Sequence, residues 1–322
     1  MGRDYSICLG TAGWGVWHSP DAGHSWVRHR APFPLNSRIQ ALVPHPSEPG
    51  TVFAAGDTGV FGSRDGGARW QRLGEPGALP TVWSLAVDPV DGRVLYAGTR
   101  PSGVYRSRDG GATWTRLPAP VAQECRIGTA FVTSLVVDPD DPHTVWAGVE
   151  IDGVFRSRDR GETWARVEAG LHDPDIHAMA VAQSCPKRLY ASTASELFIS
   201  ADLGDTWEAV DVKARWPLPY ARGLAIRPDD PDVVFAGCGE TTTGTTGHVL
   251  RSPDGGRSWE ALTLPGKPNG TVWGLATHPA DGRRVVAFTL FGEVYVSEDA
   301  GESWRKIDRA FGEIRAAAWL PA

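Results

Sequence analysis

The stretch SRDGGATW, residues 107–114, decides the fold because the chain repeats its pattern seven times. The shared pattern is Ser, any residue, Asp, any residue, Gly, any residue, Ser or Thr, and Trp, and only Arg69 departs from it, at the penultimate position. Successive aspartates are 43 to 52 residues apart, a period that indicates a repeat array. The seven copies start at Ser19, Ser63, Ser107, Ser157, Ser200, Ser252 and Ser297.

The residue types of this motif indicate a structural turn rather than a site. Glycine supplies the positive φ that a tight turn needs, and short Asp, Ser and Thr side chains bond to nearby backbone amides. The Trp that follows buries on the order of 150–250 Å² between neighbouring sheets. A catalytic group present seven times would be redundant, so we interpret the motif as part of the architecture. The alternative is that one copy binds a cation.

Each repeat contains four short segments of β-branched and aromatic residues, separated by Gly, Pro and Asp. One repeat shows them as TVWSLAVDP (81–89), RVLYAGT (93–99), GVYRS (103–107) and the residues after the motif Trp. Seven units of four strands predict an all-β fold, a seven-bladed β-propeller of antiparallel blades. We expect residues 1–322 to form one domain.

The two ends of the chain predict how the ring closes. YSICLGT (5–11) and GVWHS (15–19) match the second and third strands of a repeat, and IRAAAWLP (314–321) matches the first. The C-terminal strand is therefore expected to complete the N-terminal blade. Such closure removes the exposed sheet edges that favour aggregation.

The motif and its period resemble those of the Asp-box, or bacterial neuraminidase repeat, propellers. This superfamily includes sialidases, xyloglucan-cleaving glucanases, sortilin-type receptors and photosystem II assembly factors, and the resemblance covers nearly the whole chain. It implies the fold, whereas these families share little chemistry. Sialidases typically have six blades and an early Tyr/Phe-Arg-Ile-Pro motif, whose nearest match here is SRIQ (37–40). The glucanases generally pair two propellers, and this chain has the length of one.

Composition limits the setting. A formal net charge of −6 gives no reason to expect a nucleic acid or an anionic membrane as a partner. No apolar stretch approaches 18 residues, and MGRDYSICLG (1–10) has no hydrophobic signal core, so we expect a cytoplasmic protein with four reduced cysteines. No phosphate-binding loop or dinucleotide fingerprint is present, and no cofactor is expected.

The topology of a propeller places the loops before the innermost strands and the loops between second and third strands on one face. The repeated turns then lie on the opposite face. Two loops on the first face are longer than their counterparts, residues 117–131 and 237–248. Long loops around one opening of a rigid scaffold are a usual place for function.

Aligning the innermost strands on a shared small residue reveals one variable position. Ile, Val or Ala stands two places before the small residue in all seven strands, and Leu or Met follows it in six, as expected of core positions. The residue immediately before it varies among polar and aromatic types: Gln40, Trp83, Thr133, His177, Arg222, Trp273 and Arg315. A second variable series, three places before the small residue and nearer the opening, is Arg38, Thr81, Phe131, Asp175, Tyr220, Thr271 and Glu313.

These two series predict a central pocket for a small anionic or sugar-like ligand. Arg38, Arg222 and Arg315 offer forked donors for a carboxylate, sulfate or phosphate. Trp83 and Trp273 offer faces on which a sugar or aromatic ring stacks. The other residues that we assign to substrate binding are Gln40, Glu150 and His248.

Catalysis in this pocket would make the protein a glycosidase-like hydrolase or a lyase. Asp175 and His177 are two residues apart on one strand and would orient each other, and Glu313 and Glu150 supply carboxylates for proton transfer. Tyr220 invites comparison with the nucleophile of sialidases. The catalytic candidates are therefore His177, Asp175, Glu313 and Tyr220.

Two alternatives stay open at the level of sequence. The variable residues could simply fill the channel and pair with one another, and the same face could dock a protein partner in a non-catalytic scaffold. A metal site would draw on residues without short ligand spacing, so no metal is predicted. Those residues are His172, His177, His248, Glu150 and Glu240.

Overall fold

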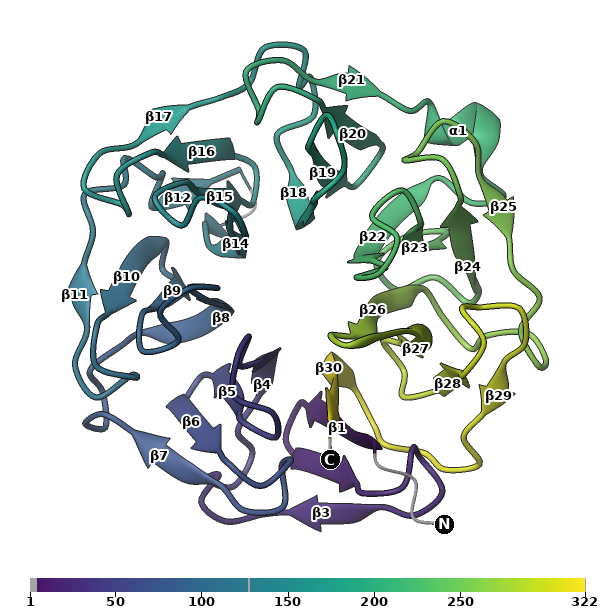
Figure 1. The fold of residues 1–322 in the computed structure, drawn as a ribbon, viewed down its shortest axis with the longest axis horizontal. Helices are drawn as coiled ribbons and strands as arrows, with labels where there is room; N and C mark the ends of the chain where they lie inside the picture. The colour runs from purple at the N-terminus through teal and green to yellow at the C-terminus, as the bar shows by residue number, and fades with distance from the viewer. Residues whose placement is uncertain (1–4, 127, 322) are drawn as a thin grey trace.

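The computed structural model describes residues 5–126 and 128–321. Seven four-stranded antiparallel sheets surround a central axis in a closed ring (Figure 1). The prediction of an all-β, seven-bladed propeller is confirmed. The innermost strands are β4 (Ile39–Pro44), β8 (Thr81–Val87), β14 (Val132–Val137), β18 (Ile176–Ala182), β22 (Tyr220–Ile226), β26 (Val272–His278) and β30 (Ile314–Pro321).

The remaining strands follow outward in each blade. The second strands are β1 (Tyr5–Thr11), β5 (Val52–Gly56), β9 (Leu95–Arg100), β15 (Val145–Val149), β19 (Arg188–Thr193), β23 (Val234–Gly239) and β27 (Asp281–Thr289). The third strands are β2 (Gly15–Ser19), β6 (Gly59–Ser63), β10 (Gly103–Ser107), β16 (Gly153–Ser157), β20 (Leu197–Ser200), β24 (Gly247–Ser252) and β28 (Val294–Ser297). The outer strands are β3 (Val27–His29), β7 (Gln71–Leu73), β11 (Thr115–Arg116), β17 (Ala165–Arg166), β21 (Glu208–Ala209), β25 (Glu260–Ala261) and β29 (Arg305–Lys306).

The C-terminal strand closes the ring as predicted. Strand β30 pairs antiparallel with β1, from Tyr5 opposite Pro321 to Thr11 opposite Ile314, in a sheet of order β3-β2-β1-β30. Figure 1 shows this yellow strand completing the purple N-terminal blade. The Trp319 side chain is fully buried in the joint.

The repeated motif forms the turn between the third and outer strands. In the copy that starts at Ser107, Ser107 Oγ donates to Asp109 Oδ1 (2.7 Å) and accepts from the backbone N of Gly111 (2.8 Å). Thr113 donates to Asp109 through its backbone N (2.9 Å) and its Oγ1 (2.6 Å). Gly111 has a φ of 91°, which favours glycine. These bonds hold the turn closed, and Trp114 Nε1 donates to Gly111 O (3.1 Å).

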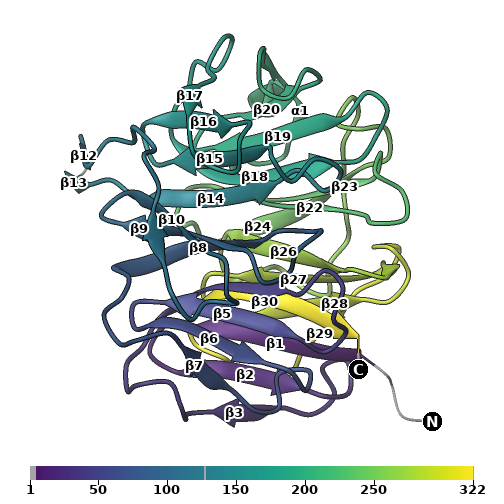
Figure 2. The same ribbon diagram turned by 60° about the vertical axis from the view of Figure 1, so that its left-hand side comes forward.

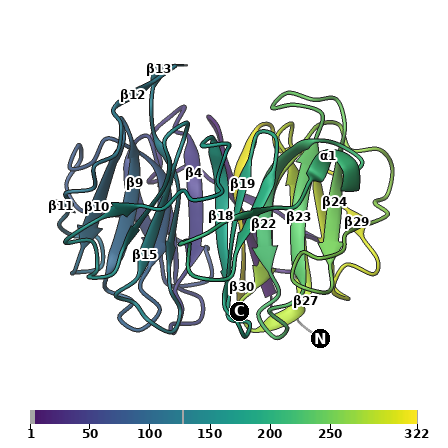
Figure 3. The same cartoon turned by 90° about the horizontal axis from the view of Figure 1, so that it is seen from above.

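Antiparallel pairing within each blade separates the loops into two sets. The repeated turns share one face, the turn face, with the loops that follow the innermost strands. The loops before the innermost strands and those between second and third strands share the opposite face, which we call the mouth face. The loop 117–131, whose residue 127 lies outside the described residues, carries a hairpin of β12 (Glu124–Cys125) and β13 (Gly128–Thr129). This hairpin projects from the ring (Figures 2 and 3).

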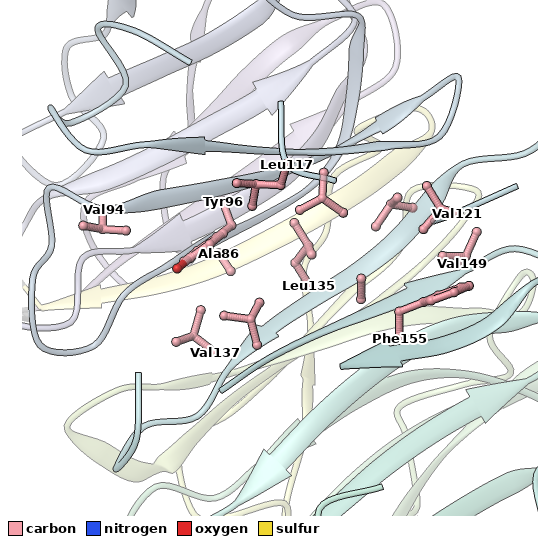
Figure 4. Close-up of a cluster of buried hydrophobic side chains, with 13 residues drawn as sticks. Ala86, Val94, Tyr96, Leu117, Val121, Leu135, Val137, Val149 and Phe155 are labelled. Atoms are coloured by element: carbon pink, nitrogen blue, oxygen red, sulfur yellow. The ribbon is translucent and has the colours of Figure 1, made fainter. Parts of the chain in front are cut away.

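The core lies between neighbouring blades rather than in one central cluster. Figure 4 shows the cluster between the third and fourth blades, in which Tyr96 of β9, Leu135 of β14 and Phe155 of β16 are buried together. Burying one such side chain stabilises the fold by roughly 1.5–3 kcal/mol. The α1 helix (Val212–Arg215) has only four residues. In the part of the chain that the structure describes, no helix has the length and apolar character needed to cross a membrane.

Candidate functional site

Every innermost strand carries a β-bulge at its variable residue. In β4, Ile39 pairs with Gly56 and Ala41 pairs with Ala55, so that Gln40 is the extra residue. A bulge bends the strand locally and redirects a side chain. In the other six innermost strands the pairing register shifts at the equivalent residue, which is Trp83, Thr133, His177, Arg222, Trp273 or Arg315.

The seven bulge residues line one cavity at the mouth end of the channel. Its volume is about 250 Å³. The small residues that follow the bulge residues also line the cavity, and Leu42, Leu85 and Leu135 line it further along their strands. Typical ligand sites have volumes of about 300–1,000 Å³, so this cavity suits a small molecule.

Side-chain donors hold neighbouring innermost strands together at the bulges. Thr133 Oγ1 donates to the carbonyl oxygen of Ile176 (2.7 Å), the residue before the next bulge. His177 Nδ1 lies 3.1 Å from the carbonyl oxygen of Ala221 in the same relationship. Because a carbonyl only accepts, the proton of neutral His177 resides on Nδ1, and Nε2 presents a lone pair.

Two arginines share the face of one tryptophan in the cavity. The Arg222 guanidinium carbon lies 3.8 Å from the Trp273 ring centroid, and that of Arg315 lies 5.1 Å from it. Arg315 also forms an ion pair with Glu313, which comes from the second variable series. Within residues 5–126 and 128–321, no ion pair involves Arg222. Burial is the main cause that lowers the pKa of Arg222, and the charge of Arg315 adds to this effect.

A third arginine, Arg100, which we did not predict from the sequence, lies over a pair of aromatic rings. The rings of Trp83 and Phe131 are 4.2 Å apart between centroids, and the Arg100 guanidinium carbon lies 5.2 Å from the Phe131 centroid. Arg100 is the last residue of β9, and Glu150 occupies the same place in the next blade. Aligning the ends of the second strands would have found it, because that position also varies: Ala12, Asp57, Arg100, Glu150, Ala194, Gly239 and Leu290.

The carboxyl groups near the cavity differ in their surroundings. Burial raises the pKa of half-buried Glu150 to about 7, and the Asp175 carboxylate adds to this, whereas Arg100 and Arg222 oppose it. Asp175 Oδ2 lies 3.7 Å from His177 Nε2. Asp175 Oδ1 is buried and forms no hydrogen bond with any residue in the described ranges. Burial lowers the pKa of His177, so its ring is neutral at neutral pH.

The remaining candidates differ in their burial and in their position relative to the cavity. Tyr220 is buried, its ring centroid lies 5.0 Å from that of His177, and its hydroxyl accepts from Thr242 Oγ1 (3.1 Å). Arg38 is exposed and lies outside the cavity, because it precedes the bulge and its backbone pairs with Ala12 at the rim. His248 lies on β24, two strands outward from the channel. The lining of the cavity includes neither Arg38 nor His248, and it also omits four other predicted site residues: Glu150, Asp175, Tyr220 and Glu313.

Among the residues that the structure describes, no group of three or more His, Cys, Asp or Glu side chains is arranged to hold a metal ion. The cavity lining combines arginines, aromatic rings and one neutral imidazole, and the carboxyl groups of Glu150, Asp175 and Glu313 lie outside that lining. Such a set can bind an anion and exchange protons with it.

Comparison with solved structures supports the fold assignment. The TM-score is 0.63 with an ancestral GH74 enzyme, at 20% identity over 87% of this chain and 38% of that one. The TM-score is also 0.63 with the GH74 xyloglucanase from Xanthomonas campestris, at 22% identity over 83% of this chain and 45% of that one. It is 0.62 with YCF48 bound to D1 peptide, at 17% identity over 93% of this chain and 88% of that one. The chain is a seven-bladed β-propeller. These likenesses show the fold alone.

Sequence similarity is limited to a few repeats, and no model of a known protein family matches the chain. A xyloglucanase of Paenibacillus sp is 32% identical over 102 residues, and xyloglucanase Xgh74A of Acetivibrio thermocellus is 34% identical over 95 residues. Vacuolar protein sorting/targeting protein 10 of Ajellomyces capsulatus is 32% identical over 78 residues. The matches cover 29%, 26% and 24% of this propeller, and 10%, 11% and 5% of those proteins.

Proposed function

We propose that this propeller binds a small anionic or sugar-like molecule in its central cavity and acts on it as a hydrolase or lyase. The observation that carries this proposal is the convergence of all seven bulge residues on one cavity. Residues that only maintain a propeller have no need to vary at one layer among Arg, Trp, His and Gln. We also propose that the repeated turns place the protein among the Asp-box propellers.

Anion binding is the part of this function that the contacts favour most. Arg222 has no carboxylate partner among the described residues, and its planar guanidinium is suited to bind a carboxylate through two parallel hydrogen bonds. Arg315 lies on the same tryptophan and adds a second positive charge. Because guanidinium groups lie over Trp273 and Trp83, an anion has better access to donors than a sugar ring has to a free aromatic face.

Proton transfer is supported by Glu150 and its neighbours. A carboxyl group that titrates near pH 7 is present in both forms at neutral pH, which suits a general acid or base. His177 offers a lone pair at Nε2, its Nδ1 contact with the Ala221 carbonyl oxygen orients the ring, and the Asp175 carboxylate lies 3.7 Å from Nε2. Glu313 positions Arg315, and the buried Tyr220 hydroxyl is held by Thr242. In this proposal Glu150 and His177 carry protons, and the other three residues support them.

A ligand screen by thermal shift tests the proposal, with small carboxylates, sulfates and sugars as probes. The expected result is that carboxylates raise the melting temperature. Molecules that carry the anionic group with the largest thermal shift, together with a bond that can be hydrolysed or eliminated, should then be turned over. His177→Ala should slow turnover by roughly 10²- to 10⁴-fold while binding changes little. If no anion shifts the transition of the wild-type protein, the proposal fails.

A non-catalytic scaffold for a protein partner is the second candidate. It is favoured by the likeness to YCF48, which covers 93% of this chain and 88% of that one, whereas the GH74 enzymes are matched over less than half of their length. Of the five exposed large apolar side chains in the described residues, Trp14, Leu35 and Phe291 (50%, 87% and 47%) lie in loops of the mouth face, whereas Val27 and Val90 do not. Exposed apolar groups gathered on one face are typical of protein interaction sites.

A further inference from the structure

Two hydrogen-bond acceptors face each other beside the cavity without a donor between them. His177 is only 6% exposed, and its Nδ1 proton is engaged by the carbonyl oxygen of Ala221. Its Nε2 lone pair therefore meets Asp175 Oδ2, another acceptor, at 3.7 Å. The second carboxylate oxygen, Asp175 Oδ1, is buried and has no partner in the described parts of the chain. Buried polar atoms are normally hydrogen-bonded, so a donor is needed here.

The cation on the next innermost strand is not that donor. Arg222 follows one strand later in the ring, and the opposite charges of Arg222 and Asp175 influence each other. Nevertheless no hydrogen bond or ion pair joins Arg222 to Asp175 or to Glu150 among residues 5–126 and 128–321. The Arg222 guanidinium instead lies over Trp273. The fold thus holds an unpaired cation, Arg222, in the cavity and an unpaired carboxylate, Asp175, beside it.

We propose that the cavity takes a small free amino acid in its zwitterionic form, with the carboxylate on Arg222 and the ammonium group donating to His177 Nε2 and to Asp175 Oδ2, the oxygen that faces it. This inference rests on the proposed ligand-binding function of the cavity and specifies the class of ligand. An ammonium group has three N–H donors, and two of them satisfy the acceptors that the protein leaves open. The carboxylate of the same molecule completes the forked donors of Arg222.

The size and charge of the site agree with this class. A volume of about 250 Å³ admits a free amino acid and excludes a folded partner. Arg315 already has a carboxylate partner in Glu313, whereas Arg222 has none among the described residues, so Arg222 supplies the free forked donors on the Trp273 face. A ligand with only a carboxylate would leave Asp175 unsatisfied, and a ligand with only an ammonium group would leave Arg222 unsatisfied. A zwitterion satisfies both.

Matched probes test the proposal by isothermal titration calorimetry on the full chain. One set is γ-aminobutyrate with butyrate, propylamine and the N-trimethylated form of γ-aminobutyrate. The other is L-leucine with 4-methylpentanoate and 3-methylbutylamine. At least one amino acid should bind about tenfold or more tightly than its deaminated and decarboxylated analogues, because each analogue leaves a buried charged group unpaired. The trimethylated probe keeps both charges but has no N–H group, so it should bind more weakly than its parent.

A pair of variants assigns the effect to Asp175. Asp175→Asn should weaken amino-acid binding about tenfold without weakening binding of the deaminated acid. Glu240→Gln is the matched control, because its exposed carboxylate is satisfied within its own loop by Thr245 (2.7 and 3.0 Å), and it should change neither affinity. If the variant at Asp175 does not fold, the probes on the wild-type protein still decide.

The outcomes separate this inference from the proposed function. If butyrate and 4-methylpentanoate bind as tightly as the amino acids do, the cavity is a simple anion site, and the zwitterion proposal is overturned while anion binding stands. If the trimethylated probe binds as tightly as γ-aminobutyrate, the role of Asp175 and His177 as N–H acceptors is wrong. If none of the probes binds, the zwitterion proposal fails, and the thermal-shift screen with other carboxylates, sulfates and sugars decides the proposed function.

Discussion

The guanidinium carbon of Arg222 lies 3.8 Å from the ring centroid of Trp273, and the two residues are the bulge residues of adjacent innermost strands, β22 and β26. A cation over an indole face is held by an attraction of up to about 2 kcal/mol when both groups are desolvated. Since no carboxylate pairs with Arg222 among the described residues, this contact positions the guanidinium without using its hydrogen-bond donors. Its donors remain available to a ligand.

Replacing Arg222 by alanine is therefore expected to affect binding more than stability. Charge-assisted hydrogen bonds of roughly 1.5–3 kcal/mol are lost, so the affinity for a small carboxylate should fall about ten- to a hundredfold. The melting temperature should hardly change, because the variant removes a positive charge near Arg315 and leaves the buried leucines intact. Titration calorimetry and a thermal melt measure both quantities. Unfolding of the Arg222→Ala protein would mean that the residue is architectural.

Glu150 is expected to make both stability and anion binding depend on pH. Its pKa in the folded protein, about 7, lies above the ordinary value of 4.5, so the folded state binds more protons than the unfolded state between these values. The contribution of Glu150 to stability is thus greatest below about pH 4.5 and is lost as the pH rises towards 7. Glu150→Gln should raise the melting temperature, relative to the wild-type protein, more at pH 8 than at pH 5.

The same titration adds a negative charge beside the arginines. Binding of a monocarboxylate to the wild-type protein should weaken as the pH rises from 6 to 8, and Glu150→Gln should remove most of that dependence. Titrations at three pH values measure the effect. An identical pH dependence in the two proteins would show that Glu150 does not titrate near the ligand.

The repeated turns are expected to contribute to stability and not to binding. Asp109→Ala removes three hydrogen bonds from Ser107 and Thr113, and by analogy with the loss of a helix cap it should cost about 0.5–2 kcal/mol. Chemical denaturation of the variant and of the wild-type protein measures this difference. Ligand affinity should be unchanged, because the turn lies on the face opposite the cavity. Lost binding in a protein of unchanged stability would contradict the structural interpretation of the motif.

Closure of the ring is expected to be indispensable. Deleting residues 314–321 would expose the inner edge of β1 and remove the fully buried Trp319, so the truncated chain should lose its soluble, monomeric state. Trp319→Ala is the milder variant and should cost roughly 3–5 kcal/mol. Size-exclusion chromatography and thermal melts measure both. A truncated monomer with an unchanged transition would refute this role of β30.

Repetition made the fold predictable, because each Ser-to-Trp motif marks one turn and the spacing marks one blade. It also made the variable layer visible, and Gln40, Trp83, His177, Arg222, Trp273 and Arg315 do line one cavity. The bulges were missed. Strand alternation does not account for Ile39 and Leu42, which are both buried although they are three residues apart, and the extra residue at Gln40 accounts for that spacing. The odd separation was a signal in the sequence.

Other features of the site depend on how the ring brings distant residues together. Arg100 ends a second strand, and only the neighbouring blade brings Phe131 beneath it. Arg38 was grouped with Arg222 and Arg315 by its residue type, although it belongs to the second variable series; it precedes the bulge and is exposed. The pairing of Glu313 with Arg315 and the isolation of Arg222 depend on side-chain geometry that alignment of repeats does not contain.

The central claim is that Arg222 and Arg315 bind a carboxylate inside the cavity formed by the bulge residues. The measurement that tests it most directly is a crystal structure of the protein with the carboxylate that gives the largest thermal shift. The account predicts that the carboxylate lies between these two guanidinium groups, within hydrogen-bond distance of Arg222, and in contact with Trp273. A ligand bound on the outer strands or on the turn face, with only water in the cavity, would contradict it.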